Sequence, residues 1–370
     1  MTVQTTHERR SLDLGIRTSR SVGRAILLAA LLLISVEAVL QVRSHLRTGR
    51  SVWSMITSSS MYVRDAELNI RLLRASAEIG GKASSIKTNR LGLRGEDIPA
   101  SRPDNELRIA VLGSSTIMSP FAASNDQTAV EILQARLRSE LSPRPVAVIN
   151  AGIGGLKVSE QLVLLEARLL PLDISLLAWY PGMNDISCAD PQQAGKGSPK
   201  RLPVPELPSW VLSYDLLVKN STWLRRSRVG SSRKLVPVFD PSRLRSELEE
   251  GVRIARSAGI QVVLVTSAAS FSPDMNAGEL ARRAATGLEH RPCYSAEEFA
   301  KAVTVFNDVI RDVAFANGIG LVDAAEAIGT EKDLFVDDTH FSLRGEQRLA
   351  ELLRTAIVSS PADPAGGPRP

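Results

Sequence analysis

The sequence LRIAVLGSS, at residues 107–115, predicts the first strand of the sheet and the turn that follows it. The run from Leu107 to Leu112 is short and mostly apolar and ends at Gly113, as expected of a strand buried in a parallel sheet. Ser114 and Ser115 follow at once. Because ligands gather at the carboxyl ends of the strands in such sheets, these hydroxyl groups are the first candidates for a functional site.

Strand-like and helix-like patterns alternate downstream of this stretch. Further short apolar runs lie at residues 146–150, 174–180, 260–266 and 320–322. Helical patterns lie at residues 127–141, 159–170, 241–257 and 296–317, and after Ser342. This alternation predicts an α/β fold, a three-layer α/β/α sandwich with a central parallel sheet.

The net charge of +5 belongs to the N-terminus. Residues 1–50 contain eight arginines and three acidic residues, so the rest of the chain carries equal numbers of basic and acidic side chains. A nucleic-acid-binding protein needs a basic face that displaces counterions from phosphates. The bulk of the chain has no surplus for such a face, so we expect no nucleic-acid partner.

Residues 25–42 (AILLAALLLISVEAVLQV) form an apolar run near the lower length limit for crossing a bilayer. Five arginines precede the run and three follow it, which favours an N-terminus inside the cytoplasm. We therefore expect a basic cytoplasmic tail over residues 1–24 and a single transmembrane anchor over residues 25–42. A cleaved signal peptide and a buried core helix are the alternatives.

The remaining chain divides into four parts by composition. Residues 43–105 have mixed polarity and little regular pattern, which predicts a juxtamembrane segment. Residues 106–360 hold the α/β pattern, and residues 187–240 interrupt it with prolines and arginines. That interruption is interpreted as an insertion or lid, or as a merely structural excursion. Residues 361–370 are rich in proline and glycine and are expected to be disordered.

The chain has two cysteines, Cys188 and Cys293, both in loop-like contexts. In an oxidising compartment they could form a disulfide, but sequence shows no proximity, and two separate thiols are expected. No cluster of metal-ligand residues surrounds either one. Composition indicates neither a metal nor a nucleotide cofactor.

Histidine is scarce, and His340 has the most informative surroundings. It lies three residues after Asp337 and just before the final helix, for which Ser342 is the expected N-cap. An acid at this spacing can fold back and fix the tautomer of the imidazole ring. Taken alone, the Asp-x-x-His pattern is equally that of an ordinary surface loop.

Polar groups also follow the next two predicted strands. Residues 150–155 (NAGIGG) form a glycine-rich turn that brings backbone N–H groups to the same sheet edge as Ser115. The turn is no dinucleotide-binding loop, because the third glycine of that motif is replaced by Lys157. After the third strand, residues 182–185 (GMND) place the Asn184 carboxamide at the same rim.

Together these segments resemble the four sequence blocks of the SGNH/GDSL hydrolase superfamily. The matching blocks are residues 113–115, 150–155, 182–185 and 337–340. The resemblance covers roughly residues 106–358 and implies a flavodoxin-like α/β/α fold. One residue departs from the pattern: Ser114 replaces the aspartate of Gly-Asp-Ser, which organises hydrogen bonds around the turn.

The resemblance implies a role for five residues. Ser115 matches the nucleophile, and Asp337 and His340 match the other members of a catalytic triad. The N–H groups of Ser115 and Gly155 and the Asn184 amide match an oxyanion hole. Ser114 as nucleophile is the weaker alternative, because only Ser115 keeps the block spacing. An α/β-hydrolase fits less well, because no G-x-S-x-G surrounds Ser115.

A second, weaker resemblance lies upstream. Residues 89–95 (NRLGLRG) are similar to a stretch that precedes the catalytic domain in membrane-anchored bacterial surface-polysaccharide proteins. We therefore expect a bacterial inner-membrane protein with its catalytic domain outside the cytoplasm. The expected activity is hydrolysis of an acyl ester, with acetylated carbohydrate as the expected substrate. An O-acetyltransferase and a catalytically inactive carbohydrate-binding module are the alternatives.

Overall fold

The computed structural model describes residues 23–25, 27–43, 45–46, 61–80, 84–189, 211–214 and 235–359. The chain forms two compact units, one from residues 1–59 with 201–230 and the other from residues 60–200 with 231–370. Most of the predicted basic tail, the C-terminal tail and most of the predicted insertion at 187–240 lie outside the described residues.

The first unit contains an apolar helix, Gly23–Arg43, which is long and apolar enough to cross a membrane. Its mean hydropathy of 2.4 suits a membrane anchor and a signal sequence alike. The one acid within the helix, Glu37, has partners: its carboxylate accepts the backbone N–H groups of Leu212 (2.9 Å) and Ser213 (2.9 Å). The polar residue in the apolar run is thus satisfied by the start of a short helix.

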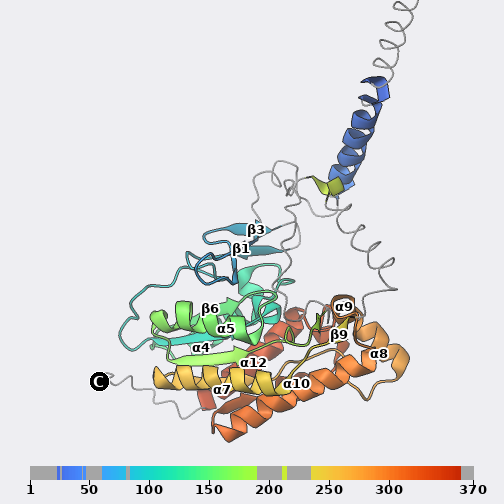
Figure 1. Ribbon diagram of the computed structural model, residues 1–370. Coiled ribbons are helices and arrows are strands. Elements are labelled where there is room, and N and C mark those ends of the chain that lie inside the picture. Colours follow the sequence, from blue (N-terminus) through green and yellow to red (C-terminus); the bar gives the residue numbers. More distant parts are fainter. Residues whose placement is uncertain are drawn as a thin grey trace, which may run out of the picture. The chain divides into compact units, whose positions relative to one another are not determined.

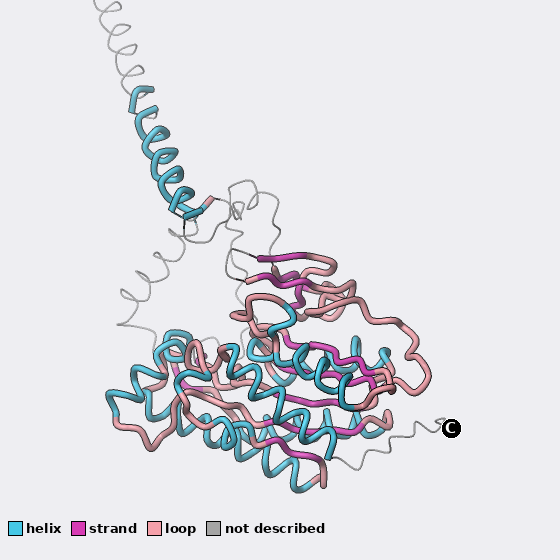
Figure 2. Tube along the Cα trace, turned by 180° about the vertical axis from the view of Figure 1, so that it is seen from behind, coloured by secondary structure: helices cyan, strands magenta, loops and turns pink. Residues whose placement is uncertain are grey.

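A five-stranded parallel sheet forms the centre of the second unit (Figures 1 and 2), with strand order β11-β10-β7-β5-β6. The strands are β5 (Leu107–Gly113), β6 (Val146–Gly152), β7 (Leu176–Tyr180), β10 (Gln261–Val265) and β11 (Gly320–Val322). Each lies where the sequence predicts a strand, with ends shifted by at most two residues.

Helices cover both faces of this sheet. The first face carries α5 (Val158–Leu164), α7 (Pro241–Ser257) and α10 (Ala296–Ala316), and the second carries α4 (Ala129–Glu140), α11 (Ala324–Ile328) and α12 (Leu343–Ser359). Alternate residues of β5 serve the two layers: Leu112 packs in the first core and Val111 in the second. The predicted three-layer α/β/α sandwich is confirmed.

Local sequence signals explain where these helices begin. Asp240 accepts the N–H groups of the first turn of α7, and Pro241 starts that helix. Ser295 and Glu298 form a reciprocal capping box at the start of α10. The Thr128 side chain caps α4, so this helix begins two residues later than the sequence pattern predicts, after a short 3-10 turn.

Residues 61–105, predicted to have little regular pattern, contain two hairpins. Their strands are β1 (Tyr62–Arg64) with β2 (Arg71–Leu73), and β3 (Glu78–Gly80) with β4 (Ser85–Lys87). Leu72 and Leu93 are buried in the same core as the sheet. An isolated antiparallel bridge joins Arg94 to Asn150 in β6. This segment is therefore an integral part of the second unit.

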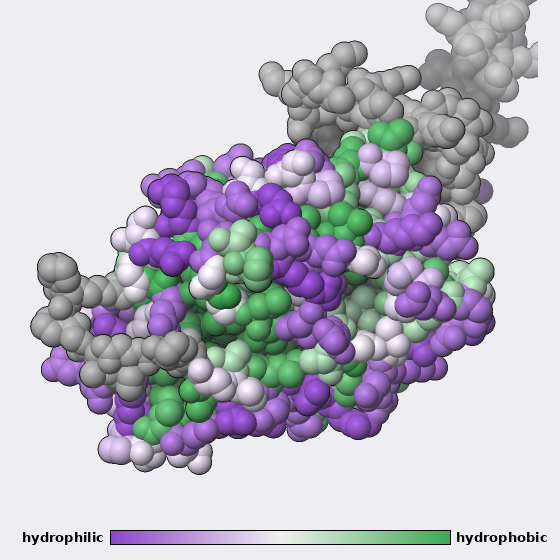
Figure 3. Space-filling model, turned by 90° about the horizontal axis from the view of Figure 1, so that it is seen from below, coloured by the Kyte–Doolittle hydropathy of each residue, from purple (hydrophilic) through white to green (hydrophobic). Residues whose placement is uncertain are grey.

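Apolar and hydrophilic side chains share the face of the second unit seen in Figure 3, where apolar groups gather in a hollow. A depression at the sheet edge is lined by Ile260, Val262 and Leu321 among others. These residues belong to the amino-terminal halves of β10 and β11 and their flanks. The depression is thus remote from the carboxyl ends of the strands, where parallel sheets bind ligands.

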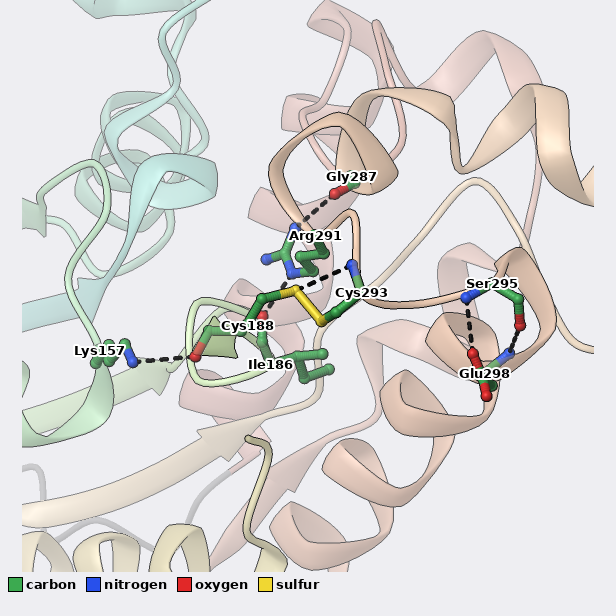
Figure 4. The surroundings of a disulfide bond; sticks show 9 residues. Lys157, Ile186, Cys188, Gly287, Arg291, Cys293, Ser295 and Glu298 are labelled. Atoms are coloured by element: carbon green, nitrogen blue, oxygen red, sulfur yellow. Dashed lines mark hydrogen bonds between the residues drawn. A yellow bond between two sulfur atoms is a disulfide. The ribbon is translucent and has the colours of Figure 1, made fainter. Parts of the chain in front are cut away.

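Cys188 and Cys293 form a disulfide bond, so the expectation of two separate thiols is wrong (Figure 4). The bond joins the short strand β8 (Cys188–Ala189), which pairs with β9 (Val236–Pro237), to the segment after helices α8 (Ala277–Arg283) and α9 (Ala285–His290). The Cα atoms lie 5.9 Å apart across a sequence separation of 105 residues. Only the fold brings them together, which is why the sequence alone could not pair them.

Candidate active site

Ser115 stands at the carboxyl end of β5, as the first residue of the single-turn helix α3 (Ser115–Met118). Residues 113–119, here called the serine turn, are tightly packed. A Cβ at Gly113 would lie 2.6 Å from the Tyr180 carbonyl oxygen, so only glycine fits there. The Ser114 side chain is buried against Gly182, whereas Ser115 is half-exposed. Of the two serines, Ser115 is the one that a substrate can reach.

His340 lies beside Ser115 although the two are 225 residues apart in sequence. Its Nε2 is 2.9 Å from the Ser115 Oγ, and its Nδ1 is 2.8 Å from the Asp337 Oδ2. The loop that carries both residues is held at its end by Ser342, whose Oγ accepts the Gly345 N–H in the first turn of α12. The structure thus brings the three predicted triad residues into one hydrogen-bonded row.

The surroundings of Asp337 favour its ionised form. Burial opposes ionisation, but hydrogen bonds from the His340 ring and from the backbone N–H groups of Thr339 and His340 outweigh it and lower the pKa of Asp337. A carboxylate in this position orients the imidazole so that its other nitrogen faces the serine hydroxyl. The row can therefore move a proton from Ser115 to His340.

The second strand end supplies the glycine turn, residues 152–156. A Cβ at Gly152 would collide with the backbone of α3, and the Ile153 N–H donates to the Gly113 carbonyl (3.2 Å). Gly155 is exposed and has φ +86, a left-handed conformation that favours glycine. The glycine turn thus packs directly against the serine turn.

Asn184 belongs to the third strand end, the asparagine loop, residues 182–189. Its Nδ2 donates to the Leu156 carbonyl of the glycine turn (3.0 Å), which brings the two predicted oxyanion residues, Gly155 and Asn184, onto neighbouring loops. An amide nitrogen carries two protons, so this bond leaves one for a ligand. The next residue, Asp185, accepts the Val158 N–H, and burial raises its pKa to about 6.

Sequence reasoning missed the buried charges that hold the serine turn. The Arg94 side chain donates to the carbonyls of Met118 (2.7 Å) and Ser119 (2.6 Å), the last residues of the turn. It also donates to the Asn125 side chain and the Ser85 carbonyl. Arg94 lies in the stretch 89–95, which the sequence analysis noted for its resemblance. The sequence did not indicate that this arginine contacts the serine turn.

Glu346 completes this arrangement from α12. Its Oε2 accepts the Ser119 hydroxyl (3.0 Å) and the Ala129 N–H (2.7 Å). Burial raises the pKa of Glu346 to about 8, although these hydrogen bonds and the charge of Arg94 oppose the rise. Arg94 and Glu346 thus both bind Ser119 at the end of the serine turn, Arg94 through the carbonyl and Glu346 through the hydroxyl.

Arg291 holds the asparagine loop in a comparable way (Figure 4). Its side chain donates to the carbonyls of Ile186 (2.6 Å) and Met183 (2.8 Å) and lies over the Phe299 ring. Two residues further on, Cys293 is bonded to Cys188 in the loop. The loop that carries Asn184 is therefore fixed by a cation and by a covalent cross-link.

Comparisons with known proteins identify the family of the chain. A sequence model of the GDSL-like lipase/acylhydrolase family matches residues 111–348. No curated protein sequence matches the chain.

Solved structures with a similar chain course include the following two. A lipase/acylhydrolase from Enterococcus faecalis has 19% sequence identity and a TM-score of 0.43, covering 68% of this chain and 94% of that one. An acetyl xylan esterase variant from Geobacillus stearothermophilus has 14% identity and a TM-score of 0.42, with the same coverage. The family match covers well over half of the chain, so this protein belongs to the GDSL-like lipase/acylhydrolase family and is a hydrolase that acts on ester bonds.

Proposed function

We propose that this protein is a serine esterase that removes an acetyl group from a carbohydrate outside the cytoplasm. The observation that carries the proposal is the row of Ser115, His340 and Asp337, with contacts of 2.9 and 2.8 Å. Ser114, where the family pattern has an acid, takes no part in that row. The presence of serine instead of aspartate at position 114 therefore leaves the proposed proton path intact.

The proposed reaction proceeds through an acyl-enzyme. The Ser115 Oγ attacks the ester carbonyl carbon while His340 takes the hydroxyl proton, and Asp337 stabilises the resulting imidazolium. The oxyanion is held by the N–H groups of Ser115 and Gly155 and by the Asn184 amide, one such donor being typically worth about 3 kcal/mol. Collapse breaks the ester C–O bond, and His340 returns the proton to the departing sugar oxygen. Water then repeats the sequence and releases acetate.

Two features support a location outside the cytoplasm. The apolar helix Gly23–Arg43 can anchor the chain or direct its export, and the arginine bias around it favours an N-terminus inside. The Cys188–Cys293 disulfide suits an oxidising compartment and is uncommon in cytosolic proteins. We propose a single-pass inner-membrane protein with its catalytic unit outside the cytoplasm, and with residues 187–240 as an insertion.

Hydrolysis of p-nitrophenyl acetate by the full-length protein in detergent tests the proposal. Ser115→Ala is expected to lower kcat by about a thousandfold or more, because the acyl-enzyme can no longer form. Ser114→Ala is the matched control and is expected to stay within a few-fold of the parent. Equal turnover by the parent and Ser115→Ala would contradict the proposal.

An acetylated xylo-oligosaccharide tests whether water or a sugar hydroxyl accepts the acetyl group. Release of acetate into solution is expected, with the Ser115→Ala variant as the blank. Transfer of acetyl to an added unacetylated oligosaccharide in excess over hydrolysis would instead assign an O-acetyltransferase.

A further inference from the structure

We propose that Arg71 is a specificity-determining residue that favours acyl esters carrying a carboxylate close to the scissile carbonyl, as an acetylated uronic acid does. The inference rests on the proposed esterase function and adds the charge of its substrate. Arg71 lies in the hairpin β1–β2, outside the four blocks that resemble the family pattern.

The Arg71 guanidinium lies beside the glycine turn. Its Nη1 is 3.5 Å from the Gly154 carbonyl oxygen and 3.0 Å from the point that a Cβ on Gly155 would occupy. Gly155 is the residue whose N–H is proposed to bind the oxyanion. A cation is thus placed next to the position where the ester carbonyl of a substrate would lie.

Neighbouring side chains hold the guanidinium in this place. It stacks on the Tyr62 ring, 5.0 Å from the ring centroid. The Tyr62 hydroxyl donates to the Met118 Sδ (3.4 Å) at the end of α3, and it packs so closely under Gly154 that a Cβ there would collide with it. The hairpin therefore packs directly against the glycine turn and α3. Because the Arg71 side chain is already held in place, binding an anion costs little conformational entropy.

No carboxylate in the described part of the chain neutralises the charge of Arg71. Arg168 pairs with Asp65, and Arg64 donates to the Asn69 side chain, but no described carboxylate pairs with Arg71. Arg71 is exposed to solvent. A guanidinium presents planar N–H groups that match a carboxylate in two parallel hydrogen bonds, which makes an acidic sugar a suitable ligand.

The imidazole side of the site has a different character. Phe121 is 50% exposed and lies edge-on against the His340 ring, with the ring centroids 5.4 Å apart. An exposed aromatic ring favours an apolar or sugar face rather than a charge. The two neighbours, Phe121 beside His340 and Arg71 beside Gly155, would orient a substrate with its carboxylate on the glycine-turn side.

A rival role for Arg71 is general stabilisation of the oxyanion, which would act on every ester. A matched pair of substrates separates the two roles: 3-acetoxybenzoate, which is anionic, and its methyl ester, which is neutral. The variants are Arg71→Gln, Arg71→Lys and, as the control from the same hairpin, Arg64→Gln. All are assayed as full-length protein in detergent at low salt.

For Arg71→Gln, kcat/KM for the anionic ester is expected to fall about tenfold, while the neutral ester stays within about twofold of the parent. Arg71→Lys should recover part of the loss, because it keeps the charge but not the paired N–H groups. Arg64→Gln should leave both esters unchanged. Added salt should slow the anionic ester in the parent and have little effect in Arg71→Gln.

Equal losses on both esters would assign Arg71 to oxyanion stabilisation and overturn the specificity role. An unchanged ratio of the two kcat/KM values in Arg71→Gln would overturn it as well. Turnover of the neutral ester by the parent tests the proposed function separately. A parent that hydrolyses neither ester would contradict that function, and the inference with it.

Discussion

The serine turn and the asparagine loop lie at the same rim of the sheet but are held by different chemistry. Two buried side chains of opposite formal charge, Arg94 and Glu346, meet at the end of the serine turn through hydrogen bonds. The asparagine loop is held by the Cys188–Cys293 bond and by Arg291. The serine-turn side of the site therefore depends on the protonation state of Glu346, and the asparagine-loop side depends on the oxidation state of Cys188 and Cys293.

The serine turn and the asparagine loop also depend on different segments of the chain. The serine turn needs the segment 61–105, which lies outside the family match and supplies Arg94. The asparagine loop needs the segment after α9, which supplies both Arg291 and Cys293. The two sides of the site are thus supported by different parts of the chain.

The largest expected effect is on the serine-turn side. Arg94→Met removes the guanidinium donors of the Met118 and Ser119 carbonyls and the cation near Glu346. We expect the free energy of unfolding to fall by about 3–5 kcal/mol, because several buried hydrogen bonds donated by one charged group are lost together, each worth about 1.5–3 kcal/mol. Urea unfolding measures this.

Arg90→Met is the control from the same segment. Arg90 pairs with Asp97 at the surface, with both side chains mostly exposed, and its loss is expected to cost under about 1 kcal/mol. Similar losses for the two arginine variants would contradict the account of the serine turn.

On the asparagine-loop side, we expect a smaller effect from removing the cross-link. The double variant Cys188→Ser with Cys293→Ser is expected to lose about 2–4 kcal/mol of unfolding free energy, because the bond closes a long loop of the unfolded chain. Arg291 still holds the loop, so esterase activity should persist at a reduced kcat. A variant as stable as the parent would show that Arg291 alone suffices.

The smallest effect concerns pH. The raised pKa of Glu346, about 8, means that the folded state keeps a proton which the unfolded state releases above about pH 4.5. The free energy of unfolding therefore falls as pH rises through this window. Glu346→Gln has no proton to lose, so between pH 6 and 7 its unfolding free energy should fall by about 1.4 kcal/mol less than that of the parent.

Asp338 and Asp185 contribute the same sign of pH dependence in both proteins, because burial raises their pKa values to about 7 and about 6. The difference between parent and Glu346→Gln therefore isolates Glu346. If the unfolding free energies of the parent and of Glu346→Gln changed with pH in the same way, the raised pKa of Glu346 would be contradicted.

Sequence patterns were sufficient where short-range physics decides the outcome. Continuous apolar runs marked the five strands, and Ser342 marked the start of the final helix. The candidate site could also be predicted in part, because strand ends in a parallel sheet meet at one edge. Ser115, Gly155 and Asn184 are separated by 29 residues or more, yet each follows a predicted strand.

The remainder depended on tertiary contacts that leave no local pattern. The hairpins of residues 61–87 have strands of only three residues, too short for a clear alternation of polar and apolar side chains. Arg94 looks like a surface arginine until α3 and α12 are placed around it. The disulfide likewise depends on a proximity between residues that are 105 positions apart.

The central claim is that Ser115 is the activated nucleophile of this site. Labelling of the full-length protein with a fluorophosphonate probe, followed by mass spectrometry of the modified peptide, tests it most directly. We expect one rapidly labelled residue, Ser115, and a strong loss of labelling in His340→Ala. Labelling at another serine, or labelling of Ser115 that does not depend on His340, would contradict it.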